Sequence, residues 1–126
     1  MRTRALAPLL VVGALALAAC GGGDSASDAT VPADADLTII AVEGLVWDAS
    51  TYTASAGELT IAVVNNSNQP HNLHIVDASG VQLPDIWDIP SMGTIDTDTV
   101  TLSAGTYTLI CTIPGHGNMK AELTVG

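Results

Sequence analysis

Four side chains of the kinds that bind soft metal ions stand in two places in the sequence. His71 stands alone, whereas Cys111, His116 and Met119 share the segment CTIPGHGNM. Two imidazoles, one thiolate and one thioether form the donor set of type 1 copper sites, in which two His and one Cys make a trigonal plane and a Met binds weakly on the axis. Thiolate sulfur favours Cu(I) and imidazole accepts both oxidation states, so this set predicts a copper ion that exchanges single electrons.

Alternating apolar and polar residues predict that these side chains lie at the ends of β-strands. A period of two is typical of half-buried antiparallel strands, and turns rich in Gly, Asn and Ser separate the segments. The alternating segments are 59–63, 71–76, 99–102, 106–109 and 121–125. Five or more short strands in about 90 residues predict an all-β sandwich, and the family resemblance described below implies its Greek-key form with about seven to eight strands. Residues 81–97, which contain Pro84 and Pro90, fit no period and are expected to form a long connection with at most one helical turn.

The same alternation predicts which way the candidate ligands face. Counting by two from the apolar residues of each strand gives His71, Cys111 and Met119 an inward orientation at the ends of three different strands. His116 lies in the Gly-rich loop between two of these strands. His74 has the opposite parity and is expected at the surface. Three candidate ligands therefore share an inward parity at strand ends, with the fourth in the loop between two of them.

These features closely resemble the cupredoxin family, the plastocyanin- and azurin-like type 1 blue copper proteins. The matching motifs are PHN at 70–72 after an Asn-rich turn, AGTY at 104–107 before the strand that leads to Cys111, and CTIPGH at 111–116 with a Met following. The resemblance covers roughly residues 37–126. It implies a copper-binding sandwich of the cupredoxin type over this whole range.

Carried over position by position, the resemblance also implies roles for individual residues. The implied ligands of one type 1 copper ion are His71, Cys111, His116 and Met119. Asn72 is implied to tie the two ligand loops together through Thr112. If Met119 is not a ligand, the fourth position is empty or is filled by the Pro70 carbonyl or by Met92.

The N-terminal residues have the pattern of an export signal. Arg2 and Arg4 precede the apolar residues 5–16, a segment shorter than the roughly 20 residues that a membrane-spanning helix needs. The sequence LAAC at 17–20 resembles the bacterial lipoprotein processing box, which implies cleavage before Cys20 and attachment of a lipid to its sulfur. The expected organisation is a lipoprotein signal peptide (1–19), a lipidated flexible tether rich in Gly, Ser, Ala and Asp (20–36) and a copper-binding domain (37–126).

Cys111 is the only free thiol once Cys20 is lipidated. A free thiol in an exported domain is open to oxidation unless a metal or a reaction uses it. Catalysis with His116 as the base would lack a third orienting group, and structural zinc sites normally contain two or more Cys. A buried, inert Cys is the alternative from packing alone. The neighbouring ligands favour copper over these alternatives.

The implied ligand count indicates a function. Four protein ligands leave no open position for a substrate, so we expect a one-electron carrier and not an enzyme. Two other classes remain open: an envelope protein that carries or stores copper, and a metal-free sandwich that serves as an adhesion or binding module. Export and lipidation would place the protein on the extracytoplasmic side of the cell membrane, anchored by the lipid.

The charge of the chain bears on its partners. The sequence has 13 Asp and Glu against 3 Lys and Arg, for a formal net charge of -10, which argues against nucleic-acid binding. Removal of residues 1–19 would leave Lys120 as the only Lys or Arg. An acidic body of this kind suits a basic redox partner, such as a cytochrome or an oxidase domain. The apolar loop around His116 is the expected docking patch and electron port.

Overall fold

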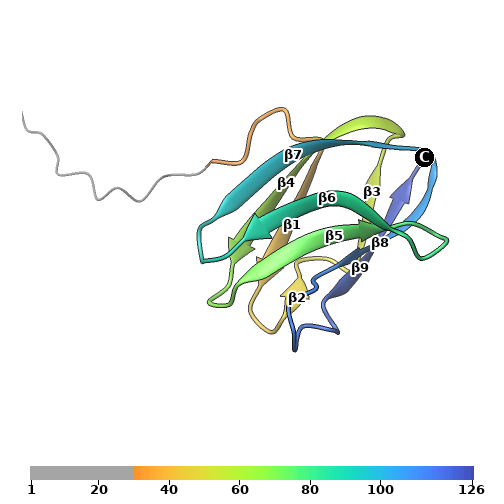
Figure 1. Ribbon diagram of the computed structural model, residues 1–126. Helices are drawn as coiled ribbons and strands as arrows, with labels where there is room; N and C mark the ends of the chain where they lie inside the picture. The colour runs from red at the N-terminus through yellow and green to blue at the C-terminus, as the bar shows by residue number, and fades with distance from the viewer. Residues whose placement is uncertain (1–29) are drawn as a thin grey trace, which may run out of the picture.

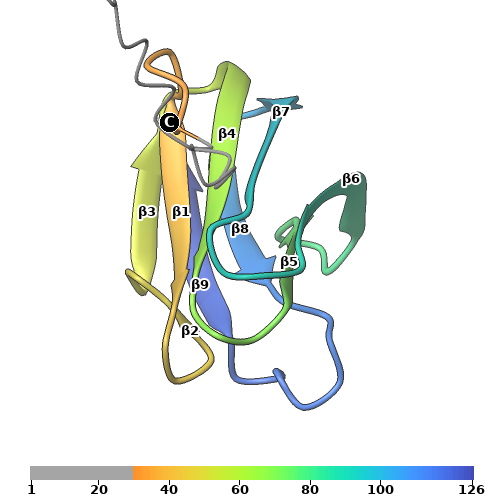
Figure 2. The same ribbon diagram turned by 90° about the vertical axis from the view of Figure 1, so that its left-hand side faces the viewer.

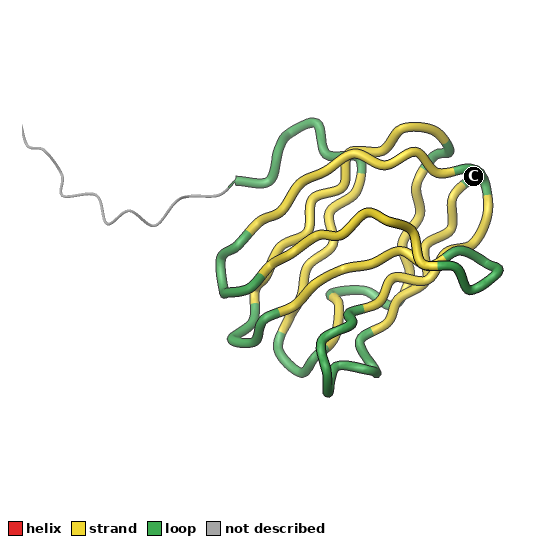
Figure 3. Tube along the Cα trace, viewed as in Figure 1, coloured by secondary structure: helices red, strands yellow, loops and turns green. Residues whose placement is uncertain are grey.

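The computed structural model describes residues 30–126, so the expected signal peptide, the lipidation at Cys20 and the first part of the expected tether lie outside the described residues. Within this range the chain forms strands and no helix (Figure 3), and none of the described residues belongs to a helix that could cross a membrane. The strands are β1 (Leu37–Val42), β2 (Val46–Trp47), β3 (Thr51–Ala54), β4 (Gly57–Asn66), β5 (His71–Val76), β6 (Gln82–Ile89), β7 (Ile95–Leu102), β8 (Gly105–Ile110) and β9 (Lys120–Val125).

The strands form two sheets packed face to face (Figures 1 and 2). One sheet has the order β2-β1-β4-β7 and the other has the order β3-β9-β8-β5-β6. Alternate residues of β1 and β9 are buried because one face of each sheet lies against the other. The largest fully buried apolar side chains of this core are Trp87, Ile39, Ile61, Leu73, Ile75, Ile89, Leu109, Met119 and Leu123. The prediction of an all-β sandwich is confirmed.

Two features of the sheets differ from the prediction. The pairs β1–β4 and β3–β9 are parallel, whereas antiparallel strands were expected throughout. Alternation determines which face of a strand is buried and carries no information about the direction of its neighbour.

The expectation of a long irregular connection over residues 81–97 is wrong. This segment contains β6 and the start of β7, joined by a short loop at 90–94. β6 is the edge strand of the five-stranded sheet, where Pro84 removes no hydrogen bond from a ladder, and this is why a proline is tolerated in a strand here. The alternation is weak in the sequence because Ile86, on the outer face, is apolar and exposed, whereas Asp85 shares the parity of the buried Trp87 and Ile89.

The connections that carry the candidate ligands lie at one end of the sandwich. Figure 1 shows the β1–β2, β4–β5, β6–β7 and β8–β9 connections grouped at this end. The chain enters the sandwich some distance from this end. The N–H of Asp36 donates to the Thr60 carbonyl, and the Asp36 carboxylate accepts the Thr60 N–H. From there β1 runs parallel to β4 until Val42 lies opposite Asn66. Asp36 was expected to be the last residue of the tether, and these two hydrogen bonds attach it to β4.

Candidate metal centre

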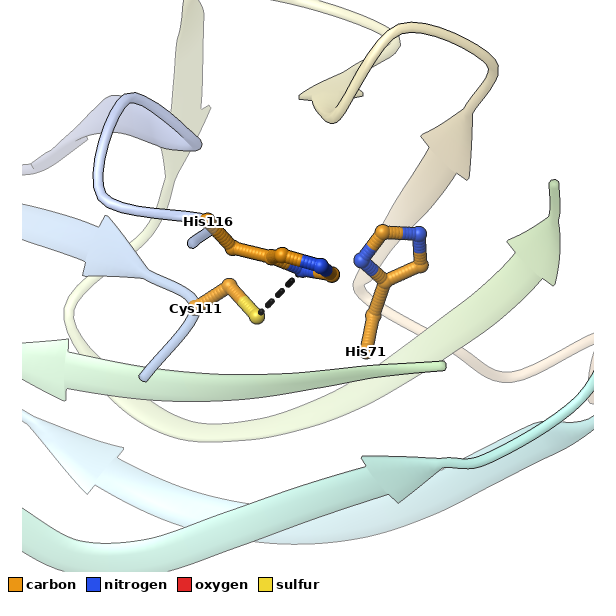
Figure 4. Close-up of side chains that lie close together, drawn as sticks. All are labelled: His71, Cys111 and His116. Atoms are coloured by element: carbon orange, nitrogen blue, oxygen red, sulfur yellow. Dashed lines mark hydrogen bonds between the residues drawn. The ribbon is translucent and has the colours of Figure 1, made fainter. Parts of the chain in front are cut away.

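Three of the four candidate ligands meet between the two sheets. His71, Cys111 and His116 each offer one donor atom, and these atoms all lie within 4.8 Å of one another. The side chains are 0%, 6% and 7% exposed, respectively. Figure 4 shows the thiol and the two rings turned toward one another. The structure therefore assembles a nitrogen–nitrogen–sulfur donor set that is almost closed to water.

His71 is the first residue of β5, and its ring lies inside the sandwich beside the rings of Trp47 and His116. The centres of the two imidazoles are 5.1 Å apart. Its Nδ1 is buried without a hydrogen-bond partner, and the ring nitrogen next to the side-chain attachment points toward Cys111 and His116 in Figure 4. Burial, with a smaller contribution from the nearby His116, lowers the pKa of His71, so its ring is neutral at neutral pH. The neutral imidazole is the form that binds metals.

Cys111 follows the last residue of β8 and keeps the inward parity of that strand. Its N–H donates to the carbonyl of Met119 at 3.2 Å, which closes the base of the loop between β8 and β9. Its Sγ lies 3.6 Å from Nδ1 of His116. Both histidines thus present Nδ1 to the site, as expected for side chains that share one metal ion.

Two consecutive turns place His116. The N–H of His116 donates to the carbonyl of Ile113 at 3.0 Å, and the N–H of Met119 donates to the carbonyl of His116 at 2.9 Å. Gly115 has φ of 90°, which together with the preceding proline fits a type II turn. A proline followed by a glycine favours this turn because only glycine adopts a positive φ at low cost. The sequence PGH therefore folds back and returns the imidazole to the thiol.

Asn72 joins the two segments that carry the donors. Its Oδ1 accepts a hydrogen bond from the N–H of Thr112 at 2.8 Å, and its Nδ2 donates to the Thr112 hydroxyl at 2.9 Å. Because Asn72 follows His71 and Thr112 follows Cys111, this pair fixes the two backbones relative to each other. It is the pair that the family resemblance implied.

The expectation that His74 lies at the surface is wrong. Its side chain does point away from the core, but it is only 5% exposed because Gln82 and Thr112 cover it. Gln82 Nε2 lies 2.7 Å from its Nδ1, and the Thr112 hydroxyl lies 3.2 Å from its Nε2. Burial lowers the pKa of His74, although Asp88 nearby raises it in part. His74 is outside the donor set and supports Thr112 from the outer face of the sheet.

One pair of residues beside the site was not expected to contribute to it. Asn65 lies near the end of β4 and Ser67 in the turn that follows it. Both are 1% exposed, and the Ser67 hydroxyl is 2.7 Å from Nε2 of His71. The sequence showed only an Asn-rich turn before His71. Such a turn indicates a change of chain direction and does not predict a contact with the His71 imidazole.

Comparison with known proteins assigns the chain to a family. A family profile described as copper binding proteins, plastocyanin/azurin family, matches residues 34–126. The chain belongs to the plastocyanin/azurin family of copper-binding proteins. No curated protein matches the chain by sequence.

Solved structures of plastocyanin/azurin-type proteins have the same fold. Reduced auracyanin from the photosynthetic bacterium Roseiflexus castenholzii is 27% identical, with a TM-score of 0.62 over 71% of this chain and 95% of that one. An azurin from the obligate methylotroph Methylomonas sp. strain J is 16% identical, with a TM-score of 0.62 over 75% of this chain and 99% of that one. A reduced amicyanin mutant is 21% identical, with a TM-score of 0.58 over 75% of this chain and 86% of that one. The azurin and amicyanin similarities establish the fold alone.

The donor set of this plastocyanin/azurin-family chain fits copper. Two imidazoles and a thiol lie together, and the unpartnered Nδ1 of His71 is a buried polar atom that a metal ion would satisfy. Met119 is fully buried and bonded to both Cys111 and His116 through its backbone, whereas Met92 is 60% exposed. Of the two methionines in the described part of the chain, Met119 is therefore the better placed for the fourth ligand, which remains a prediction.

Proposed function

We propose that the chain is a one-electron carrier that is anchored on the extracytoplasmic side of the cell membrane and passes electrons between protein partners. The observation that carries the proposal is the buried set of His71, Cys111 and His116. Copper held by these residues, with Met119 as the proposed axial ligand, supplies a one-electron couple. The similar auracyanin was solved in a dithionite-reduced state, and this similarity supports a redox role for the chain.

The chain contributes to electron exchange by holding its donors in one arrangement. His71 is fixed in β5, Cys111 at the end of β8, and the contacts of Asn72 with Thr112 hold these two segments together. Because the donors are nearly inaccessible to water, little solvent has to reorganise around them. A closed site also gives no entry to a substrate, so we propose a carrier and not an enzyme.

We propose that electrons enter and leave through His116. Its ring is 7% exposed, and it lies in a loop whose neighbouring residues Pro114, Gly115 and Gly117 are exposed. Ile113 of the same loop is half-buried. This is a small, weakly polar surface next to a donor atom, which suits brief docking of a redox protein.

The partner that we propose is a basic redox protein, such as a cytochrome or an oxidase domain. Lys120 is the only Lys or Arg among residues 30–126, and no Asp or Glu side chain in this range is buried. Four carboxylates lie on β6 and β7, here called the acidic edge: Asp85, Asp88, Asp96 and Asp98. Their field would steer a positively charged partner during association.

Electron transfer to a basic cytochrome tests this function. We expect the copper-loaded protein to reduce the cytochrome in stopped-flow experiments, with a rate constant that falls steeply as salt rises, because charges are screened beyond about 8–10 Å. Asp88→Asn with Asp98→Asn should slow the reaction at low salt. Asp34→Asn with Glu122→Gln is a control of equal charge outside β6 and β7, because Asp34 precedes β1 and Glu122 lies on β9, which pairs with β3 and β8. Absence of electron exchange would contradict the carrier role. A rate that does not depend on salt would contradict steering alone.

The proposed anchor has its own test. We expect mass spectrometry of the protein extracted from membranes to find an N-terminal Cys20 that carries diacylglyceryl, with residues 1–19 removed. Cys20→Ser should release the protein or leave it unprocessed, because the thiol that accepts the lipid is absent. An unmodified N-terminus in the parent protein would show that the anchor is wrong and would leave the copper site unaffected.

A further inference from the structure

We propose that Ser67, held in place by Asn65, positions the ring of His71 and sets which of its nitrogens carries the proton. The Ser67 hydroxyl oxygen would accept a hydrogen bond from Nε2–H. Nδ1 would then carry no proton, and its lone pair would face Cys111 and His116. The effect of Ser67 on copper affinity rests on the proposed copper-binding function. The effect of Ser67 on the His71 tautomer does not depend on it.

The contact between Ser67 and His71 is short and shielded from water. The hydroxyl oxygen lies 2.7 Å from Nε2, Ser67 is 1% exposed and His71 is 0% exposed. A hydroxyl can donate or accept, so the direction of this bond depends on where its single proton goes.

Asn65 determines that direction. Its Nδ2 donates to the carbonyls of Gln69 at 2.7 Å and Ile89 at 2.9 Å, so its Oδ1 must face Ser67. There Oδ1 accepts the Ser67 N–H at 2.9 Å and lies 3.0 Å from the hydroxyl oxygen. An amide oxygen can only accept, so the hydroxyl donates to Asn65, with the Gln69 carbonyl at 3.3 Å as a second acceptor. The hydroxyl oxygen, which also accepts the Gln69 N–H at 3.3 Å, is then left to accept from His71.

The other tautomer of His71 would leave a buried donor without a partner. If Nδ1 carried the proton, its N–H would lie among buried groups where Nδ1 has no hydrogen-bond partner. A buried donor left without an acceptor is strongly disfavoured, because it has lost its hydrogen bonds to water and gained none in the protein, and this decides the tautomer. Both observations assign the proton to Nε2, and the lone pair on Nδ1 is the form that a metal ion requires.

The arrangement has a consequence for the metal site. An outer partner that accepts the second ring N–H of a ligating histidine fixes the ring and makes it more basic, and its loss typically lowers metal affinity by about 10–100-fold. The Ser67–Asn65 pair would provide this support from a side chain, and Asn65 in turn is tied to the last residue of β6 through the Ile89 carbonyl.

The first test uses the metal-free full chain labelled with nitrogen-15. Long-range proton–nitrogen spectra should show His71 with Nε2 protonated and Nδ1 unprotonated, at a pH where the ring is neutral. Ser67→Ala should shift this population toward a mixture of tautomers, because the acceptor is gone. A parent protein with Nδ1 protonated would overturn the proposal, and this result does not require any variant to fold.

The second test measures Cu(II) affinity of the same proteins by competition with a chelator. Ser67→Ala should weaken binding by about 10–100-fold. Ser79→Ala is the matched control, since it also removes a hydroxyl bonded to a side chain in a turn, here to Asp77 in the β5–β6 connection. A folded Ser67→Ala protein with the parent tautomer and the parent affinity would overturn the proposal. If Ser67→Ala shifts the tautomer but neither the parent nor the variant binds copper, the proposed function is wrong. The conclusion that Ser67 sets the tautomer of His71 would still stand.

Discussion

Cys111→Ser is expected to abolish the intense visible absorption that Cu(II) produces in the parent protein. That absorption comes from charge transfer between a thiolate and copper, and Cys111 is the one free cysteine among residues 30–126. Its Sγ is 3.6 Å from Nδ1 of His116 and shares the donor cluster with His71. The check is a titration with Cu(II), followed by visible absorption and by electron paramagnetic resonance.

The controls for Cys111→Ser separate loss of the ligand from loss of the fold. Serine is nearly the same size as cysteine, so circular dichroism of the metal-free variant should match that of the parent. His74→Ala should keep the colour, because His74 contacts Thr112 and Gln82 and lies outside the donor set. Colour retained in a folded Cys111→Ser protein would show that the thiolate is not a ligand.

Substitution of Met119 is expected to change the reduction potential while copper stays bound. A thioether on the axis of a type 1 site binds weakly and tunes the potential more than it holds the metal. Met119→Leu should raise the potential because it removes a ligand, and Met119→Gln should lower it because an amide oxygen favours Cu(II). A tenfold change in the preference between the two oxidation states corresponds to about 59 mV, and we expect shifts of this order by voltammetry.

Met92→Leu is the matched control for Met119. Met92 is 60% exposed in the β6–β7 connection, and its replacement should leave both the potential and the spectrum unchanged. If the Met119 variants match the parent and the Met92 variant does not, the axial ligand is Met92. If none of them differs, the fourth position is empty or is filled by the Pro70 carbonyl.

The sequence was sufficient to predict the architecture and the meeting of three donors. The alternation of β8 predicted the burial of Cys111, and the alternation of β9 predicted the burial of Met119. His71 and Cys111 could be placed because each stands at the end of a strand whose core-facing residues were evident, whereas His116 was placed only by its position in the loop between Cys111 and Met119. β6 could not be predicted, because Pro84 lies within it and because its alternation is broken by an inward-parity Asp85 and an exposed Ile86.

What the sequence could not predict are contacts that depend on how loops return to the sheets. His74 has the outward parity that was expected, but parity does not show that Gln82 and Thr112 cover the outer face at that point. Ser67 and Asn65 read as turn residues because Ser and Asn are common in turns for their own local hydrogen bonds. The Ser67 hydroxyl reaches the ring of His71 because of the path that the β4–β5 connection takes in the folded protein, and the sequence does not show this path.

The entry of the chain beside Thr60, away from the connections that carry the donors, has a consequence for a lipidated protein (Figure 1). An attachment through Cys20 would hold the sandwich by the end remote from His116. The face that exchanges electrons would then look outward from the bilayer, toward proteins that diffuse past or project from elsewhere on the surface. If residues 20–35 form the flexible tether that the sequence predicts, the root-mean-square reach of that tether is only about 20–25 Å, and the domain would stay close to the bilayer. A shorter tether would hardly reduce access to such partners. A partner whose docking surface lies at the level of the lipid headgroups could be reached only if the domain rotated by a large angle toward the bilayer.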